Sequence, residues 1–205
     1  MSDAAASPRV AAVVLAAGAS RRLGQPKQLI QIAGESLLYR TARLAIEAGC
    51  APVFVVLGYQ ARRFAAELAS LAVEAVVNAN YSSGMGSSLA WGVAAARRSR
   101  PEMDALLLLV CDQPRLTVDH LRRLLALHAR GTAAITASSY GGRSGVPAVF
   151  ARSLFPELEQ IEGDRGARDL ILSHGAQTVD WPEGIYDIDL PEDLPNFGIY
   201  PGGQR

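Results

Sequence analysis

One stretch of the chain, Ala17–Lys27, combines small residues with positive charge directly after an apolar run. It contains Gly18, Arg21, Arg22 and Lys27, and Lys27 is the only lysine among the 20 Lys and Arg residues. A loop of small residues lets backbone N–H groups approach an anion closely. Lysine adds a compact charge suited to phosphate. The loop is therefore predicted to bind a triphosphate; a plain strand-to-helix turn with solvated arginines is the alternative.

Two well-known phosphate-binding patterns do not fit this loop. The Walker pattern has four residues between its first glycine and a Gly-Lys-Ser/Thr run, whereas five residues separate Gly18 from Gly24 and no Lys-Ser pair follows. The Gly-x-Gly-x-x-Gly fingerprint of dinucleotide-binding proteins is also absent, which argues against a dinucleotide-dependent oxidoreductase.

Acidic residues that could hold a hard cation occur in two places. Asp112 follows a buried apolar run, and Asp187 and Asp189 alternate in "YDIDLPED". Mg2+ takes one or two protein carboxylates together with substrate phosphates, so these three are the candidate ligands. For Asp112 the alternative is a turn before Pro114. For the other two it is a solvated or arginine-paired acid.

Two kinds of loop could bind the rest of a substrate. The neutral loop "NYSSGMGSSLAWG" offers hydroxyl and N–H groups for a base or ribose, although its serines could simply cap a helix. The glycine-rich segments "GGRSGVP" and "GDRGAR" carry Arg143, Arg165 and Arg168, which could hold an anionic second substrate.

The order of elements is an alternation of strand and helix. Apolar runs predict strands, and capped amphipathic segments predict helices between them. Strands are expected at 10–16, 52–57, 73–78, 105–110 and 133–138, an edge or antiparallel strand near 141–150, and short strands at 177–181 and 185–190; helices are expected at 36–48, 60–71, 87–98, 117–130, within 163–175 and from 191. This alternation implies a parallel sheet with helices on both faces. Ligands then bind beyond the carboxyl ends of the strands.

Composition excludes several classes of protein. The net charge is zero, which argues against nucleic-acid binding, and no apolar run reaches the ~18 residues that a membrane span needs. The start "MSDAAASPRV" lacks the features of a signal peptide. Cys50 and Cys111 are expected to be buried free thiols of a cytoplasmic protein, and the three histidines to lie on solvated helix faces.

The motifs together resemble the MobA-like nucleotidyltransferases. "LAAGASRRLGQPKQL" is similar to the family signature, and "NYSSGMGSSLAWG", "CDQP", "GVPAVF", "GDRGAR" and "DIDLPED" follow in order over nearly the whole chain. Ala17 with "GMGSSL" and "GDRGAR" is most similar to the molybdenum cofactor cytidylyltransferases of that family. The resemblance implies one domain over 1–205, with a Rossmann-like, mostly parallel α/β sheet of the nucleotide-diphospho-sugar transferase type.

The same resemblance implies a role for each matching residue. Arg22 and Lys27 would be catalytic and hold the triphosphate, and Asp112, Asp189 and Asp187 would bind Mg2+, or Mn2+ in its place. The nucleotide would meet Leu15, Ala16, Ala17, Gly18, Asn78, Gly84 and Ser88, and the acceptor would meet Arg143, Arg165 and Arg168. One departure is Leu190, where the family usually has threonine; it removes a hydroxyl near the metal or the helix start.

The implied reaction is transfer of CMP from CTP to the terminal phosphate of the molybdopterin cofactor, with release of pyrophosphate. A molybdoenzyme or its insertion chaperone would be a transient partner. Guanylyl transfer, another acceptor such as a sugar phosphate, and a nucleotide-binding cofactor carrier without turnover are the alternatives.

Overall fold

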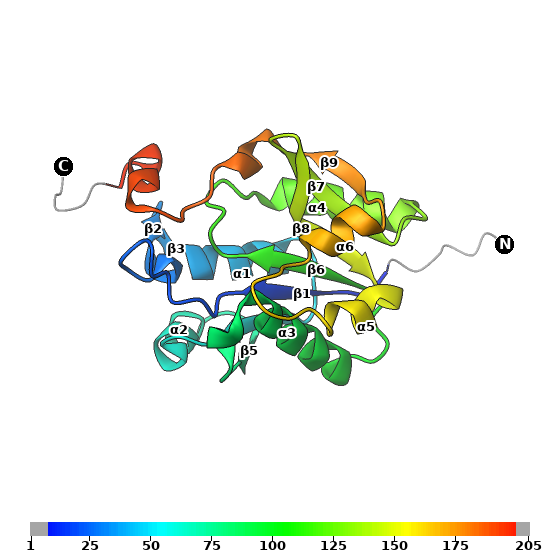
Figure 1. The fold of residues 1–205 in the computed structure, drawn as a ribbon, viewed down its shortest axis with the longest axis horizontal. Helices are drawn as coiled ribbons and strands as arrows, with labels where there is room; N and C mark the ends of the chain where they lie inside the picture. Colours follow the sequence, from blue (N-terminus) through cyan, green and yellow to red (C-terminus); the bar gives the residue numbers. More distant parts are fainter. Residues whose placement is uncertain (1–7, 200–205) are drawn as a thin grey trace.

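A seven-stranded sheet forms the centre of the protein in a computed structural model that describes residues 8–199 (Figure 1). Its order is β5-β4-β1-β6-β8-β7-β9. The strands are β1 (Val10–Leu15), β4 (Val53–Leu57), β5 (Glu74–Val77), β6 (Ala105–Val110), β7 (Ile135–Tyr140), β8 (Arg143–Ala151) and β9 (Gln177–Asp180). Residues 1–7, most of the segment used in the signal-peptide argument, lie outside the described part.

All strands of this seven-stranded sheet except β8 run parallel, which confirms the mostly parallel sheet. The β1 strand pairs in parallel with β4 and β6, and β8 is antiparallel to both β6 and β7. The β8 strand is not at an edge, because Phe150 pairs with Leu106 on one side and Ile135 on the other. A two-residue turn joins β7 to β8, and its residues Gly141 and Gly142 both have positive φ, as tight hairpin turns require.

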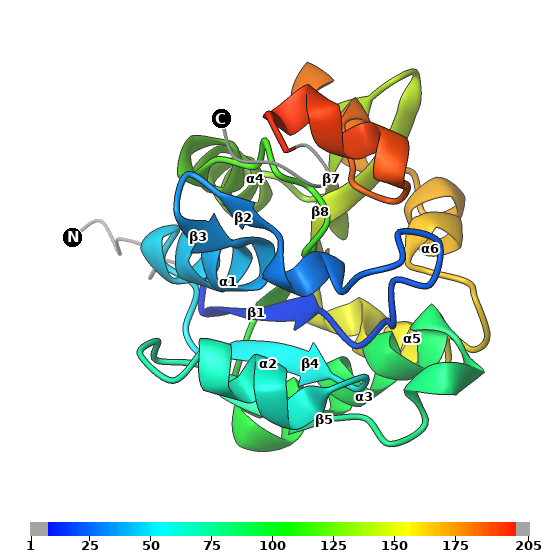
Figure 2. The same ribbon diagram turned by 90° about the vertical axis from the view of Figure 1, so that its left-hand side faces the viewer.

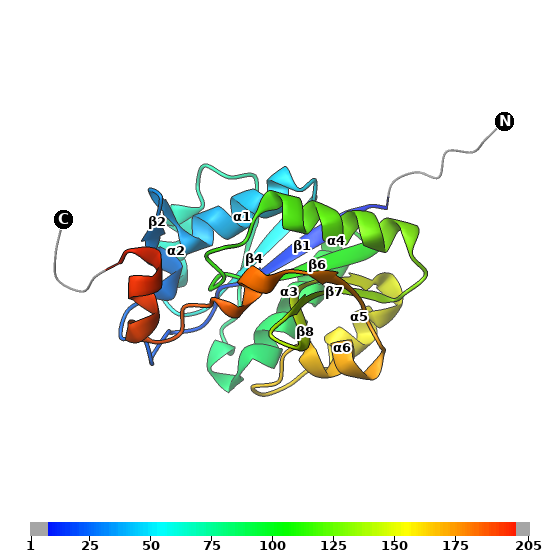
Figure 3. The same cartoon turned by 90° about the horizontal axis from the view of Figure 1, so that it is seen from above.

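Helices cover both faces of this sheet, as Figure 3 shows from above. One face carries α1 (Leu37–Glu47), α2 (Ala61–Glu67) and α4 (Val118–Arg130); the other carries α3 (Met85–Ser99), α5 (Phe155–Leu158) and α6 (Arg168–Ser173). The α3 helix packs closely on the sheet at Gly92, where a Cβ atom would lie 2.7 Å from side-chain atoms of Val13 and Val56. Each face therefore has its own apolar core.

Helix caps form where the sequence predicts them. The Ser36 hydroxyl accepts a hydrogen bond from the Tyr39 N–H at 3.2 Å, and Thr117 accepts one from the His120 N–H at 3.3 Å. A short hairpin of β2 (Gln31–Ile32) and β3 (Glu35–Ser36), which the sequence did not predict, lies beside α1 (Figure 1 and Figure 2).

One strand expected from the sequence is absent. Residues 185–190 form no strand, because Ile185 closes a 3-10 turn (Pro182–Ile185) and the next residues pair with no strand in the described part. The helix expected from 191 is present, as a 3-10 helix (Pro191–Phe197).

Two of the three histidines also differ from expectation, whereas His174, just after α6, is exposed as expected. His120 is completely buried and stacks on Trp181, with 4.7 Å between the ring centroids. His128 is partly buried against Thr136. The amphipathic helix α4 places both on the side facing the sheet rather than toward solvent.

The three loops expected at the binding rim do converge. They follow β1, β5 and β6, and residues from each line the same pocket. Within residues 8–199, no helix is both long enough and apolar enough to cross a membrane.

Candidate active site

The loop after β1 is held in shape by a buried glutamine. Gln28, 1% exposed, donates hydrogen bonds from Nε2 to the carbonyl oxygens of Ala16 at 3.0 Å and Gly18 at 2.7 Å. The Ser20 hydroxyl accepts from the Lys27 N–H at 3.1 Å. Within residues 8–199, the backbone N–H groups from 18 to 22 make no hydrogen bond to protein, so they can donate to an anion.

Lys27 lies between two of the predicted carboxylates. Its Nζ is 2.8 Å from Asp112 Oδ2 and 2.7 Å from Asp189 Oδ1. The Lys27 side chain is 16% exposed, and Asp189 also accepts from Arg22 Nη2 at 3.0 Å. Residues from three distant parts of the chain thus form one charged cluster.

Backbone contacts explain how Asp189 reaches Asp112. The Ile188 N–H donates to the Asp112 carbonyl oxygen at 2.9 Å, and the Ile188 side chain is fully buried in a small apolar cluster with Leu23 and Leu194. With Ile188 turned inward, Asp187 and Asp189 on either side both line a pocket. The alternation predicted from the sequence holds here without a strand.

The start of the last 3-10 helix is capped despite the leucine at 190. Asp193 Oδ2 accepts from the N–H groups of Asp189 at 2.9 Å and Leu190 at 2.7 Å. A carboxylate three residues into a helix can fix the residues before it in this way. The backbone of Asp189 is therefore held even without the threonine hydroxyl of the family pattern.

Electrostatics differ between the members of the cluster. Burial alone would lower the pKa of Lys27, but Asp112 and Asp189 raise it well above its ordinary value. Burial tends to raise the pKa of Asp189, yet Lys27 and Arg22 bring it below normal. The pKa of Asp187 is raised by burial and by the charges of Asp112 and Asp189. Lys27 and Asp189 are thus charged near neutral pH.

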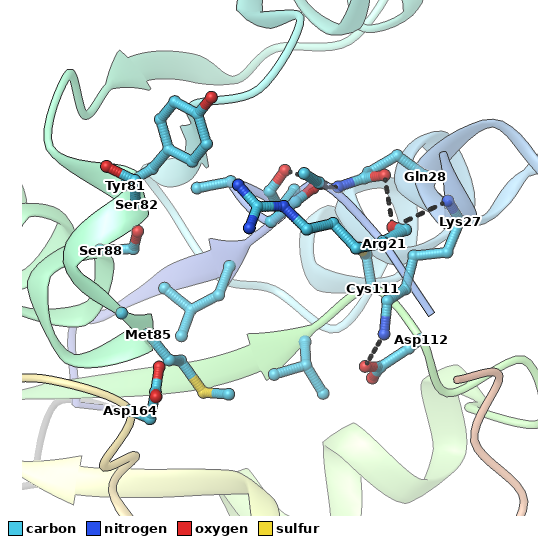
Figure 4. Close-up of a pocket in the computed structure, with 18 residues that line it drawn as sticks. Arg21, Lys27, Gln28, Tyr81, Ser82, Met85, Ser88, Cys111, Asp112 and Asp164 are labelled. Atoms are coloured by element: carbon cyan, nitrogen blue, oxygen red, sulfur yellow. Dashed lines mark hydrogen bonds and ion pairs between the residues drawn. The ribbon is translucent and has the colours of Figure 1, made fainter. Parts of the chain in front are cut away.

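A pocket of about 330 Å3 opens beside the loop after β1 (Figure 4). It is lined by most of the residues predicted to contact the nucleotide, and also by Lys27 and Asp112: Leu15, Ala16, Ala17, Gly18, Gly84, Ser88, Lys27 and Asp112. Figure 4 shows Lys27 and Asp112 at one side of the pocket and Ser88, Ser82 and Tyr81 at the other.

A second pocket, of about 310 Å3, adjoins the first and shares Leu15, Met85, Val110 and Asp112 with it. Asp187, Asp189, Arg143 and Arg168 line it. In its wall, Gln113 Nε2 and the Tyr140 hydroxyl both donate to the Val146 carbonyl oxygen, at 3.0 and 3.1 Å. Because Asp112 lines both pockets, molecules bound in the two pockets would both lie next to its carboxylate.

Three predicted residues lie elsewhere. Asn78 lines neither pocket; it is buried and donates to the hydroxyls of Ser87 at 3.0 Å and Ser88 at 3.1 Å. Arg22 is mostly exposed and reaches the cluster through Asp189. Arg165 lines a separate groove between α5 and α6.

Several pocket residues were not singled out from the sequence. The first pocket contains Asp164 from the loop before α6, and also Arg21, which the sequence placed in the cationic loop but without a role of its own; its side chain extends toward Tyr81 in Figure 4. Gln113 and Tyr140 belong to the second. Arg21 and Arg22 are adjacent in the sequence, and only the conformation of the loop decides which of the two side chains enters the pocket. Nothing in the sequence indicated that Asp164 lies in this pocket, because its segment "GDRGAR" was assigned to the anionic second substrate.

A divalent cation suits the oxygen donors of this site. Among residues 8–199, no three acidic, histidine or cysteine side chains form a complete metal cluster. Asp187 nevertheless faces the negative charges of Asp112 and Asp189, which raise its pKa. One or two of these carboxylates with phosphate oxygens would match the preference of Mg2+.

The cysteine of the first pocket is not activated as a nucleophile. Burial raises the pKa of the Cys111 thiol to about 12, so this pocket residue is protonated at neutral pH. The site offers cations, carboxylates and backbone donors, which together can bind and polarise phosphate groups. Fold and site thus define an α/β protein of the nucleotide-binding transferase type.

The chain belongs to the family described as the MobA-like NTP transferase domain, whose model matches residues 12–179. The chain is 38% identical over 170 residues to "Nicotine blue oxidoreductase" of Paenarthrobacter nicotinovorans, covering 78% of this chain and 80% of that one. It is 32% identical over 199 residues to "Purine catabolism protein PucB" of Bacillus subtilis, covering 91% and 95%.

The chain is also similar to a transferase and to two solved structures. The chain is 37% identical over 116 residues to the "Probable molybdenum cofactor guanylyltransferase" of Synechococcus elongatus, covering 55% of each chain. The crystal structure of Rv0371c from Mycobacterium tuberculosis matches with a TM-score of 0.80 and 30% identity, over 93% of this chain and 97% of that one. A manganese complex of Rv0371c matches with a TM-score of 0.75 and 27% identity, over 92% and 97%.

Proposed function

We propose that this protein transfers CMP from CTP to the terminal phosphate of a molybdopterin cofactor and releases pyrophosphate. The observation that carries the proposal is the position of Asp112, which lines both of the adjoining pockets and is paired with Lys27 in the first. One pocket has small residues, free N–H groups and cations for a nucleoside triphosphate. The other has Arg143 and Arg168 for an anionic acceptor.

In this reaction an oxygen of the acceptor phosphate attacks the α-phosphorus of CTP. A new P–O bond forms as the bond to the β-phosphate oxygen breaks, and the electron pair leaves with pyrophosphate. The attacking group is already anionic, so no strong general base is needed. Arg21 and Lys27 would offset the negative charge that develops at the transferred phosphate.

The ion pairs of Lys27 give it a second role before substrate binds. Its ammonium group neutralises Asp112 and Asp189, which would otherwise repel each other. Binding of a triphosphate would offer Lys27 new anionic partners, and would release one or both carboxylates for a cation. Asp112, Asp189 and Asp187 would hold Mg2+, which when bound supplies further charge neutralisation for the phosphates.

The choice of CTP rests on the likeness of Ala17 and the neighbouring motifs to cytidylyltransferases. The name of the Synechococcus relative favours GTP as the alternative. A phosphorylated acceptor of another kind, such as a sugar phosphate, would use the same chemistry. A cofactor carrier that binds nucleotide without turnover would use the first pocket alone.

An oxidoreductase is a second candidate, because the Paenarthrobacter relative carries that name. The sequence lacks the glycine fingerprint of a dinucleotide site, and the loop after β1 is instead arranged by Gln28. Oxidation of NADH or NADPH in the presence of an electron-accepting dye would reveal such an activity.

Pyrophosphate release tests the proposal. We would supply CTP, GTP, ATP and UTP in turn with Mg2+, each with and without molybdopterin cofactor. Release that needs the acceptor and CTP is expected. Release with GTP would keep the mechanism but overturn the base assignment. Nucleotide binding without release under every condition would favour the carrier.

A further inference from the structure

Asp164 enters the nucleotide pocket through a close backbone contact between two distant loops. The Gly86 N–H donates to the Gly163 carbonyl oxygen at 2.8 Å. A Cβ on Gly86 would lie 2.8 Å from the carbonyl carbon of Glu162, and one on Gly84 would collide with the Gly163 carbonyl group. Glycine at both positions lets the loop before α6 pack against the start of α3, so the position of Asp164 is built into the fold.

The surroundings of Asp164 differ from those of the charged cluster. In Figure 4 its carboxylate lies near Met85, on the side of the pocket opposite Lys27, with Ser88 above it. No hydrogen bond or ion pair joins it to the other residues drawn. Tyr81, Ser82 and Ser88 on this side are neutral. Asp164 thus places a carboxylate at the end of the pocket away from Lys27, where neither Lys27 nor Arg21 pairs with it.

A carboxylate accepts hydrogen bonds and cannot donate them. It would repel phosphate, so it suits the nucleoside end of a bound triphosphate. Cytosine carries an amino group at C4 beside an unprotonated N3, whereas uracil carries a carbonyl oxygen at C4 beside an N3–H group. An ionised carboxylate placed against the C4 substituent attracts the amino group of cytosine and repels the carbonyl oxygen of uracil. The hydroxyls of Ser82 and Ser88 can both donate and accept, so they provide no comparable discrimination.

We propose that Asp164 is a specificity-determining residue that accepts a hydrogen bond from the amino group of the base and so selects CTP over UTP. The proposal rests on the proposed function, since it requires a nucleoside triphosphate in this pocket. Hydrogen bonds to charged groups are strong enough for about a tenfold preference or more.

Equilibrium binding of CTP and UTP with Mg2+, measured by calorimetry without any acceptor, tests this inference. For the unmodified protein we expect CTP to bind about tenfold tighter than UTP or better. Asp164→Asn should bring the two affinities close together, because the amide can donate to the uracil carbonyl. Glu162→Gln, two residues earlier, removes the same charge from a side chain outside the pocket and should keep the preference.

The outcomes separate this inference from the proposed function. If the unmodified protein binds no nucleoside triphosphate, the proposed function fails and this inference with it. If it binds CTP but Asp164→Asn keeps the original ratio of CTP to UTP affinity, the role of Asp164 alone is refuted. A loss of discrimination between CTP and dCTP, with the UTP ratio unchanged, would assign Asp164 to the ribose and also overturn the inference. Thermal unfolding of each variant shows that it is folded.

Discussion

Lys27 Nζ lies 2.7 Å from Asp189 Oδ1, although 162 positions separate the two residues in the chain. The Ile188 N–H bond to the Asp112 carbonyl fixes the backbone behind this pair, and Asp112 completes it from the other side. The chain's sole lysine thus joins the first loop of the sheet to the segment before the last helix. If the proposed function holds, the substrate phosphates must compete with Asp189 for the ammonium group of Lys27.

Lys27→Met should lower turnover by roughly 1,000-fold, because a charge aimed at the transferred phosphate is lost. It should also destabilise the fold by about 1–3 kcal/mol, since two partly buried carboxylates lose their shared partner. Pyrophosphate release and urea unfolding measure the two effects. Lys27→Arg keeps the charge and should restore most of the stability but less of the turnover. Turnover of Lys27→Met within about threefold of the unmodified protein would refute the catalytic role.

Gly18→Ala should weaken nucleotide binding without affecting stability. Gly18 does not have positive φ, and a Cβ there would meet no atom within 4 Å, so the fold can accept the methyl group. The group would enter space that the nucleotide is expected to fill. We expect affinity for CTP to fall about tenfold or more at an unchanged melting temperature. Normal affinity would show that the base or phosphates do not approach this glycine.

Arg168→Ala and Arg165→Ala form a matched pair three residues apart. Arg168 lines the second pocket, whereas Arg165 lines the groove between α5 and α6. Losing the cation in the pocket should raise the KM for the acceptor about tenfold or more, and leave the KM for CTP nearly unchanged. Arg165→Ala should behave like the unmodified protein. If Arg165→Ala raises the KM for the acceptor and Arg168→Ala does not, the acceptor binds in the groove between α5 and α6 instead.

His120 should make the protein less stable in mild acid. Burial, together with the charge of Arg123, lowers its pKa from 6.5 to about 4. The unfolded chain takes up the proton first, so stability present above pH 6.5 is lost as the pH falls toward 4. The loss approaches about 3 kcal/mol. His120→Phe, which can still stack on Trp181, should flatten this part of the pH profile of the unfolding free energy. An unchanged slope would assign the acid sensitivity to other groups.

The sequence predicted the parallel strands well because each is a short apolar run closed by a turn. It was less informative after residue 139. The strand β8 carries the same apolar pattern whether it lies inside the sheet or at an edge, and only its pairing with both β6 and β7 decides this. Residues 185–190 look like a strand because their apolar residues alternate with acids. Burial of Ile188 produces that alternation without a strand partner.

The sequence predicted the loops of the candidate site but not the long-range contacts between them. The rule that ligands bind beyond the strand ends located the loops after β1 and β6. It could not show that Lys27 pairs with two carboxylates, since those contacts span 85 and 162 positions. Asp164 was missed because its loop reaches the first pocket through a backbone contact at Gly86. Side-chain patterns do not encode such contacts.

The most direct test of the proposed reaction follows the α-phosphate of CTP. CTP labelled at that phosphorus would be incubated with Mg2+, molybdopterin cofactor and either the unmodified protein or Lys27→Met. We expect the label to appear in the cofactor, with pyrophosphate formed in equal amount, and the variant to transfer almost none. Label that stays in CTP, or appears as free CMP while the cofactor remains unlabelled, would contradict nucleotidyl transfer to this acceptor.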